Sequence, residues 1–162
     1  MLKKDLFVTL SDRNYLEQAK QLFSSLYFNA GWRGDYMLLA HDVPDADLDW
    51  FRRKGILIRH CRPLFEGEQG GMNVAMTSKF YLFLPEFKKW RTIIYSDADA
   101  TVRASLNGLC GLEGFYSVTD SSQHIKFQIA SSKTIRQRGL DAKECRRKIC
   151  ELRKQYDVNG PA

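Results

Sequence analysis

The most informative run in this sequence is Thr92-Ile93-Ile94-Tyr95-Ser96-Asp97-Ala98-Asp99. Its first four residues are β-branched or aromatic, which predicts a short buried strand. Two aspartates, Asp97 and Asp99, follow that strand directly, with one residue between them. Because ligands of open α/β sheets bind beyond the carboxyl ends of the strands, a ligand site is expected here.

The rest of the chain alternates predicted strands with predicted helices. Apolar runs predict strands at residues 5–10, 36–40, 56–58, 92–95 and 115–119. Apolar spacing and turn residues predict helices at residues 15–30, 43–54, 77–90 and 141–156, the third broken at Pro85. Such alternation implies βαβ units. We therefore expect an α/β fold with a Rossmann-like, mostly parallel sheet flanked by helices.

Length and composition fit a single domain over residues 1–162. The chain is 44% hydrophobic and contains 10 Phe, 7 Tyr and 3 Trp, which excludes disorder of the whole chain. No apolar run reaches the ~18 residues of a membrane span, and the first residues lack the apolar region of a signal peptide. Residues 60–76 form a long irregular segment, of the length typical of a functional or mobile loop.

The cysteines and histidines show no metal-binding pattern. The four cysteines have no CxxC spacing, and the three histidines are scattered along the chain. Without a secretory signal, we expect free thiols and a cytoplasmic location, with no structural zinc.

The net charge of +6 belongs to one segment. Residues 133–154 contain nine Lys or Arg and three Asp or Glu, and the charges of the remaining residues cancel. A basic helix is most often a solvated face, so no specific nucleic-acid partner is expected. Binding of RNA or another anionic surface by this segment remains an alternative, which a steep salt dependence would support.

Asp97 and Asp99 predict a divalent-cation site. Two carboxylates in a turn at a strand end can converge on one hard cation, and Mg²⁺ or Mn²⁺ prefers oxygen ligands and leaves room for substrate phosphates. The alternative is that the two aspartates cap a helix near residues 101–109, because Asp is favoured at that position.

Three blocks of the sequence resemble the glycogenin-like retaining glycosyltransferases, the family that includes bacterial lipopolysaccharide galactosyltransferases and plant galactinol synthases. Phe7-Val8-Thr9-Leu10, followed by Asn14-Tyr15-Leu16, is similar to the family's nucleotide-binding strand and first helix. Thr77-Ser78-Lys79-Phe80 resembles the segment whose basic residue approaches the donor diphosphate, and residues 94–102 resemble the metal motif with its flanks. The blocks occur in the family's order.

The resemblance implies a nucleotide-diphospho-sugar transferase fold of the glycosyltransferase A type, and a donor site for a nucleotide sugar, most often a UDP-sugar. The reaction implied is transfer of a hexose to an acceptor hydroxyl with retention. Asp97 and Asp99 would hold Mn²⁺ or Mg²⁺, and Lys79 would meet the diphosphate as a catalytic point charge; the alternative is a solvated helix lysine. The residues implied for the nucleotide are Phe7, Thr9, Leu10, Asn14, Tyr15, Ser96 and Ala98. Tyr15 would stack on the base, unless it is a core residue of the first helical turn.

The resemblance covers residues 6–109 and departs from the family beyond them. In the family a histidine well downstream completes the metal site, and the acceptor pocket is also downstream. Here His124 is the one histidine after Asp99, and its surroundings do not resemble that motif. We therefore expect a donor-binding part without the acceptor side, which would leave a sheet edge uncovered and favour self-association. The expected partners are a nucleotide-sugar donor and a carbohydrate or glycan acceptor.

Two other functions fit parts of the same pattern. Asp97-x-Asp99-x-Thr101 after an apolar strand also resembles the first motif of haloacid-dehalogenase-like phosphatases, in which Asp97 would be the nucleophile and Asp99 the acid/base. That motif normally lies on the first strand, whereas about 90 residues precede it here. A non-catalytic, nucleotide-sugar-binding remnant is the second alternative.

Overall fold

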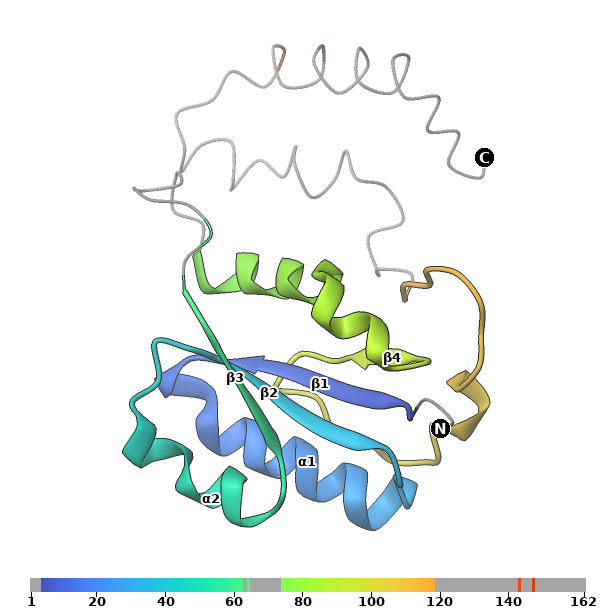
Figure 1. Ribbon diagram of the computed structural model, residues 1–162, viewed down its shortest axis with the longest axis horizontal. Helices are drawn as coiled ribbons and strands as arrows, with labels where there is room; N and C mark the ends of the chain where they lie inside the picture. The colour runs from blue at the N-terminus through green and yellow to red at the C-terminus, as the bar shows by residue number, and fades with distance from the viewer. Residues whose placement is uncertain (1–3, 63, 65–73, 119–142, 144–146, 148–162) are drawn as a thin grey trace. The chain divides into compact units, whose positions relative to one another are not determined.

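The computed structural model describes residues 4–62, 64, 74–118, 143 and 147. The chain divides into two compact units, residues 1–113 and 114–162, and the fold that follows is that of the first unit (Figure 1). The expected helix at 141–156 lies outside the described residues except for Lys143 and Arg147, both helical. The expectation of one domain over 1–162 stays a prediction.

A four-stranded parallel sheet forms the centre of the first unit. Its strands are β1 (Leu6–Ser11), β2 (Asp35–His41), β3 (Leu57–Cys61) and β4 (Ile93–Tyr95), in the order β3-β2-β1-β4. Leu6 of β1 lies opposite Asp35 on one side and Ile93 on the other. The expected α/β class and parallel sheet are confirmed, because all three strand pairs are parallel.

Two α-helices cover one face of the sheet, α1 (Leu16–Ala30) and α2 (Asp49–Arg53). Apolar residues three and four apart turn one side of α1 inward, as the spacing predicted. Side chains from this helical layer and from the sheet build the larger core cluster. Its central members are Phe7, Leu22, Phe23, Leu26, Leu38 and Phe51. The short 3₁₀ helix η2 (Asp45–Leu48) leads into α2.

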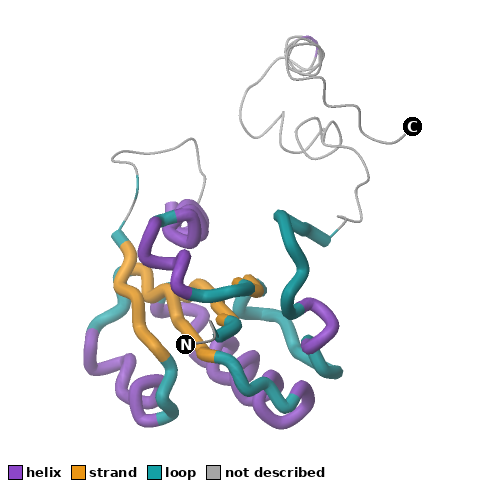
Figure 2. Tube along the Cα trace, turned by 45° about the vertical axis from the view of Figure 1, so that its right-hand side comes forward, coloured by secondary structure: helices purple, strands orange, loops and turns teal. Residues whose placement is uncertain are grey.

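Two 3₁₀ helices cover the opposite face, η3 (Val74–Phe83) and η4 (Pro85–Lys89). In Figure 1 the green helix η3 lies on the side of the sheet away from α1 and α2, and Figure 2 shows helices on both sides of the strands. A second core cluster fills this layer, and it includes Leu6, Val8, Met37, Leu39, Phe87 and Trp90. The predicted break is present, because Leu84 is extended and Pro85 starts a new helix.

After β4, the described residues form neither the strand expected at residues 115–119 nor the helix of the capping alternative. Residues 115–118 of the expected strand 115–119 are irregular, and Phe115 and Val118 are 81% and 96% exposed. Thr119 lies outside the described residues. The helix expected near residues 101–109 is an irregular segment ending in a single 3₁₀ turn, η5 (Asn107–Leu109), with no side-chain cap. Asp97 and Asp99 therefore cap no helix there, and the capping alternative is wrong.

The opposite, amino end of the sheet is tied together by charged contacts. Arg91 donates two hydrogen bonds to the carboxylate of Asp5, at 3.0 and 2.7 Å. Trp90 Nε1 donates to Asp35 Oδ2 at 2.8 Å. These bonds fix the start of β4 against the starts of β1 and β2. Among the residues that the structure describes, no helix is both long enough and apolar enough to cross a bilayer.

Candidate functional site

The carboxyl ends of β1, β2 and β4 meet at one edge of the sheet, because the strands are parallel. Two hydrogen bonds hold the segment after β4 against β1. Ser96 N donates to Val8 O at 3.1 Å, and Thr9 Oγ1 donates to Ser96 O at 2.8 Å. Thr9 is fully buried, so its hydroxyl serves this contact and does not face solvent.

Asp97 is the centre of a small charged cluster at this edge. Lys79 Nζ, from η3, lies 2.9 Å from Asp97 Oδ1, and the Tyr95 hydroxyl donates to the same oxygen at 2.8 Å. The Lys79 ammonium also lies 5.0 Å from the centre of the Tyr95 ring. Lys79 and Asp97, which belonged to separate motifs in the sequence, are therefore in direct contact.

These contacts shift two pKa values. Partial burial raises the pKa of Asp97, but the hydrogen bonds from Lys79 and Tyr95 outweigh that effect and leave its pKa below the usual value. Burial, followed by the hydrogen bond to Asp97 and the charges of Asp97 and Asp99, raises the pKa of Tyr95. Asp97 is thus held as a carboxylate and Tyr95 as a neutral phenol.

Asp97 and Asp99 stand in one turn with a buried alanine between them. Ala100 N donates to Asp97 O at 3.2 Å, and Ala98 is packed inside. Both aspartates are exposed, and the negative charges of both contribute to the raised pKa of Tyr95. Within the described residues, no group of three histidine, cysteine, aspartate or glutamate side chains forms a metal centre. Two carboxylates suit Mg²⁺ or Mn²⁺ when substrate phosphates and water supply the other ligands.

The residues expected to face the nucleotide fall into two groups. Asn14 and Tyr15 lie on the 3₁₀ helix η1 (Arg13–Tyr15), which follows β1, and both are exposed. Asp12 caps this helix by accepting a hydrogen bond from Asn14 N at 2.9 Å. Tyr15 is 47% exposed, so the interpretation of Tyr15 as a core residue is wrong.

The other expected nucleotide residues are more enclosed. Phe7 is 1% exposed and packs edge-on against Phe23 and Trp32, so it belongs to the core and supports β1. Its expected place beside the nucleotide stays a prediction. Leu10 and Ser96 are half-buried at the carboxyl edge, next to the cluster around Asp97.

His41, the last residue of β2, was not expected at the site from the sequence. Its Nδ1 lies 2.9 Å from the hydroxyl oxygen of Ser78, the residue before Lys79. His41 is 4% exposed and Ser78 is fully buried. The one available signal was position, because His41 follows a predicted strand and so lies at the same edge as Asp97.

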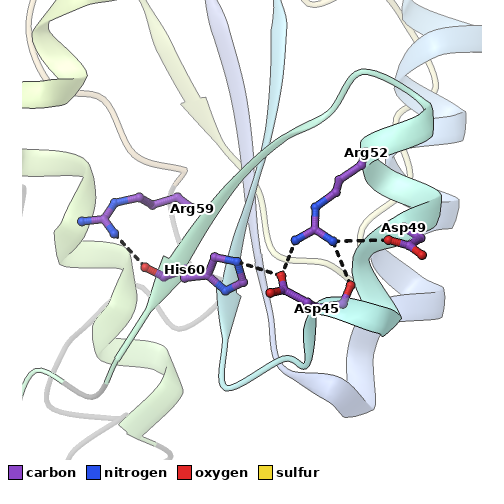
Figure 3. A network of polar contacts seen from close by, with 5 residues as sticks. All are labelled: Asp45, Asp49, Arg52, Arg59 and His60. Atoms are coloured by element: carbon purple, nitrogen blue, oxygen red, sulfur yellow. Dashed lines mark hydrogen bonds and ion pairs between the residues drawn. The ribbon is translucent and has the colours of Figure 1, made fainter.

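A second polar network links η2 and α2 to β3 and is drawn in Figure 3. Arg52 donates to the carboxylate and the carbonyl of Asp45 and to the carboxylate of Asp49. His60 Nε2 lies 3.4 Å from Asp45 Oδ1. The hydrogen bonds from Arg52 are the main reason that the pKa of Asp45 is lowered. These groups are exposed, and such surface pairs contribute little to stability.

One solved structure similar to this chain is the apo form of the glycosyltransferase GlyE from Streptococcus pneumoniae TIGR4. The two are 19% identical, with a TM-score of 0.52, and the match covers 99% of this chain and 41% of that one. The chain therefore spans less than half the length of that protein. No family model matches the chain, and neither does any curated protein. At this level of identity the likeness establishes the fold, which is glycosyltransferase-like.

Proposed function

We propose that this chain binds the diphosphate of a nucleotide sugar at the edge formed by β1, β2 and β4, as the donor-binding part of a hexosyltransferase. The observation that carries the proposal is the contact of Lys79 and Tyr95 with Asp97 in a glycosyltransferase-like fold. It joins a cation and a carboxylate pair at the position where α/β sheets bind ligands.

Asp97 and Asp99 are the residues that would hold Mn²⁺ or Mg²⁺. Both hydrogen bonds described at Asp97 end on Oδ1, which fixes the carboxylate and leaves Oδ2 as the oxygen for a cation. When bound, the ion supplies positive charge that offsets the charge on a departing diphosphate. The carboxylate oxygens suit a hard divalent cation. The proposed sugar transfer assigns no nucleophile to the described residues.

Lys79 would contribute by position and charge. Its ammonium, held between Asp97 and the Tyr95 ring, is a compact point charge at the rim of the carboxylate pair. A cation fixed before the donor arrives stabilises developing negative charge without a reorganisation cost. Tyr15, exposed on η1, supplies an aromatic face for the base. The proposal also includes a UDP-sugar as the donor, retention of configuration and a carbohydrate acceptor. These three features rest on the resemblance of the three sequence blocks to the glycogenin-like glycosyltransferases.

Calorimetric titration of UDP, first with Mn²⁺ and then with EDTA, tests the proposal. We expect binding by the wild type with Mn²⁺ and loss of binding with EDTA. Asp97→Asn should abolish the metal-dependent part and leave the circular dichroism spectrum unchanged. Asp49→Asn, which alters an exposed aspartate of α2, is the matched control and should bind like the wild type.

Two outcomes would contradict the proposal. A folded wild-type chain that binds no UDP with Mn²⁺ would favour the interpretation that the motifs persist without function. Binding that is equal in the wild type and in Asp97→Asn would remove the metal assignment. Hydrolysis of p-nitrophenyl phosphate without UDP binding would instead favour the phosphatase alternative.

A further inference from the structure

A buried polar contact joins β2 to η3 at the candidate site. His41 Nδ1 and Ser78 Oγ lie 2.9 Å apart, His41 is 4% exposed and Ser78 is fully buried. The Asp42 carboxylate lies 3.4 Å from the other ring nitrogen, Nε2. A proton held on Nε2 by Asp42 leaves Nδ1 to accept the Ser78 hydroxyl, so each polar group has a partner.

The contact is adjacent to the cluster around Asp97. Ser78 is followed by Lys79, whose ammonium lies 2.9 Å from Asp97 Oδ1. In a 3₁₀ helix successive side chains are about 120° apart, because three residues make one turn. When the Ser78 side chain is anchored toward β2, the direction in which the Lys79 side chain projects from η3 is therefore set as well.

The side chains of η3 around this contact differ in burial. Ala75, one 3₁₀ turn before Ser78, is buried against the sheet, whereas Met76 and Phe80 are 54% and 60% exposed. A further hydrogen bond of this helix lies farther along, where the Tyr81 hydroxyl donates to Arg62 O at 3.2 Å. The His41–Ser78 contact is a buried polar bond that ties η3 to β2 at the residue next to Lys79.

We propose that His41 is a positioning residue for Lys79. Through Ser78 it holds η3 in the rotation that brings the Lys79 ammonium to Asp97 and, resting on the proposed function, to a bound diphosphate. His41 does not touch the ligand in this arrangement. An apolar side chain could fill the same space, but it would leave the buried Ser78 hydroxyl unpaired and remove the directional bond.

The first experiment needs no ligand and follows the reactivity of Lys79. Reductive methylation of the wild type and of the variants His41→Leu, His41→Asn and Ser78→Ala is measured at each lysine by mass spectrometry. Lys54, an exposed lysine at the end of α2, is the internal reference. We expect Lys79 to react several-fold faster in His41→Leu and Ser78→Ala, with Lys54 unchanged. His41→Asn should restore slow modification, because the Asn amide can occupy the place of Nδ1.

An unchanged Lys79 rate in folded His41→Leu and Ser78→Ala would overturn the proposal. A rise at Lys54 and Lys79 together would mean general loosening and would also overturn it. If His41→Leu fails to fold, Ser78→Ala alone decides, because it removes a single buried hydroxyl.

The second experiment is a double-mutant cycle on UDP affinity with Mn²⁺. His41→Leu should weaken binding several-fold in the wild-type background and have no further effect in a Lys79→Met background. Equal losses in the two backgrounds would mean that His41 acts independently of Lys79, which contradicts the proposal. If the wild type binds no UDP, the proposed function fails, while the methylation experiment still decides the role of His41.

Discussion

The side chain of Tyr15 is exposed near the carboxyl end of β1 because of the local backbone conformation. The Asp12 cap and the 3₁₀ turn of η1 place Tyr15 just before α1, so its ring does not join the core below the helix. An aromatic ring that is 47% exposed next to a strand end is available for stacking.

Tyr15→Ala should therefore weaken UDP binding. Stacking of an aromatic side chain on a base contributes about 1–3 kcal/mol in the analogous nucleic-acid setting, which corresponds to roughly five-fold or more in affinity. Tyr15→Phe keeps the ring and should bind like the wild type, and Tyr27→Ala removes an exposed ring from the far end of α1 as a control. Calorimetry measures all three. Unchanged affinity in Tyr15→Ala would exclude a contact between this ring and the base.

At the scale of elements, the Asp5–Arg91 pair joins β1 to the segment that leads into β4. The hydrogen bonds from Arg91 are the largest cause of the lowered pKa of Asp5. A carboxylate whose pKa is lower in the folded state stabilises the fold above its unfolded pKa of about 4. That stabilisation is lost as the pH falls through the lower, folded value.

Asp5→Asn should therefore reduce the free energy of unfolding near neutral pH by about 1 kcal/mol, less than for a buried charged hydrogen bond because the Arg91 side chain is exposed. The difference from the wild type should shrink as the pH falls below about 4 and through the lowered pKa of Asp5 in the folded state, because the wild-type carboxylate then becomes protonated. Urea unfolding at several pH values measures this difference. A difference that stays constant across this range would contradict the assignment of the stabilisation to the Asp5 carboxylate.

The end of α1 depends on a glycine. Gly31 follows Ala30 with a φ of 59°, a left-handed conformation that is easy for glycine and costly for other residues. A Cβ at Gly31 would meet no atom within 4 Å, so only backbone strain would change. Gly31→Ala should lower the free energy of unfolding by about 1 kcal/mol.

Gly108→Ala is the matched control. A Cβ there also meets nothing within 4 Å, and the backbone is not left-handed. Thermal unfolding should show a lower midpoint for Gly31→Ala and little change for Gly108→Ala. Equal midpoints in the two variants would mean that α1 ends without help from this conformation.

At the scale of the molecule, the order of strands and helices was predictable because β1, α1 and β2 bury clear apolar patterns. Leu22 and Leu26 on α1, for example, are spaced for one face and lie in the core. Residues 115–118 were mispredicted as a strand because an apolar run becomes a strand only where a neighbour pairs with it. No strand that the structure describes pairs with these residues.

The candidate site was predictable only in part. Asp97 and Lys79 belong to recognisable segments, and their contact follows from η3 passing over the end of β4, which brings the middle of η3 to Asp97. His41 was missed because a single histidine after a strand has no local signature. Its role depends on Ser78, which lies 37 residues farther along the chain.

The surface of the molecule predicts self-association. Within the described residues, β4 pairs only with β1, so it is an outer strand of the sheet with one side unpaired. The outer side of η3 also exposes Met76 and Phe80. Sedimentation should show association that increases with concentration, and Phe80→Ser should reduce it because that face becomes more polar. A chain that remains monomeric over a wide concentration range would contradict this prediction.

The two strands that pair with β1 lie at very different distances along the chain. On one side Leu6 pairs with Asp35, which is 29 residues farther along the chain, and on the other side it pairs with Ile93, which is 87 residues farther along. Closing a longer loop costs more entropy, and chains are made from the amino end, so β1, β2 and β3 can assemble before β4 joins. Pulse-labelled hydrogen exchange should therefore protect amides of β2 before those of β4. A half-made or half-refolded chain can then already have the packing of β1 and β2 against α1 and α2, while the residues that would hold a ligand come together last.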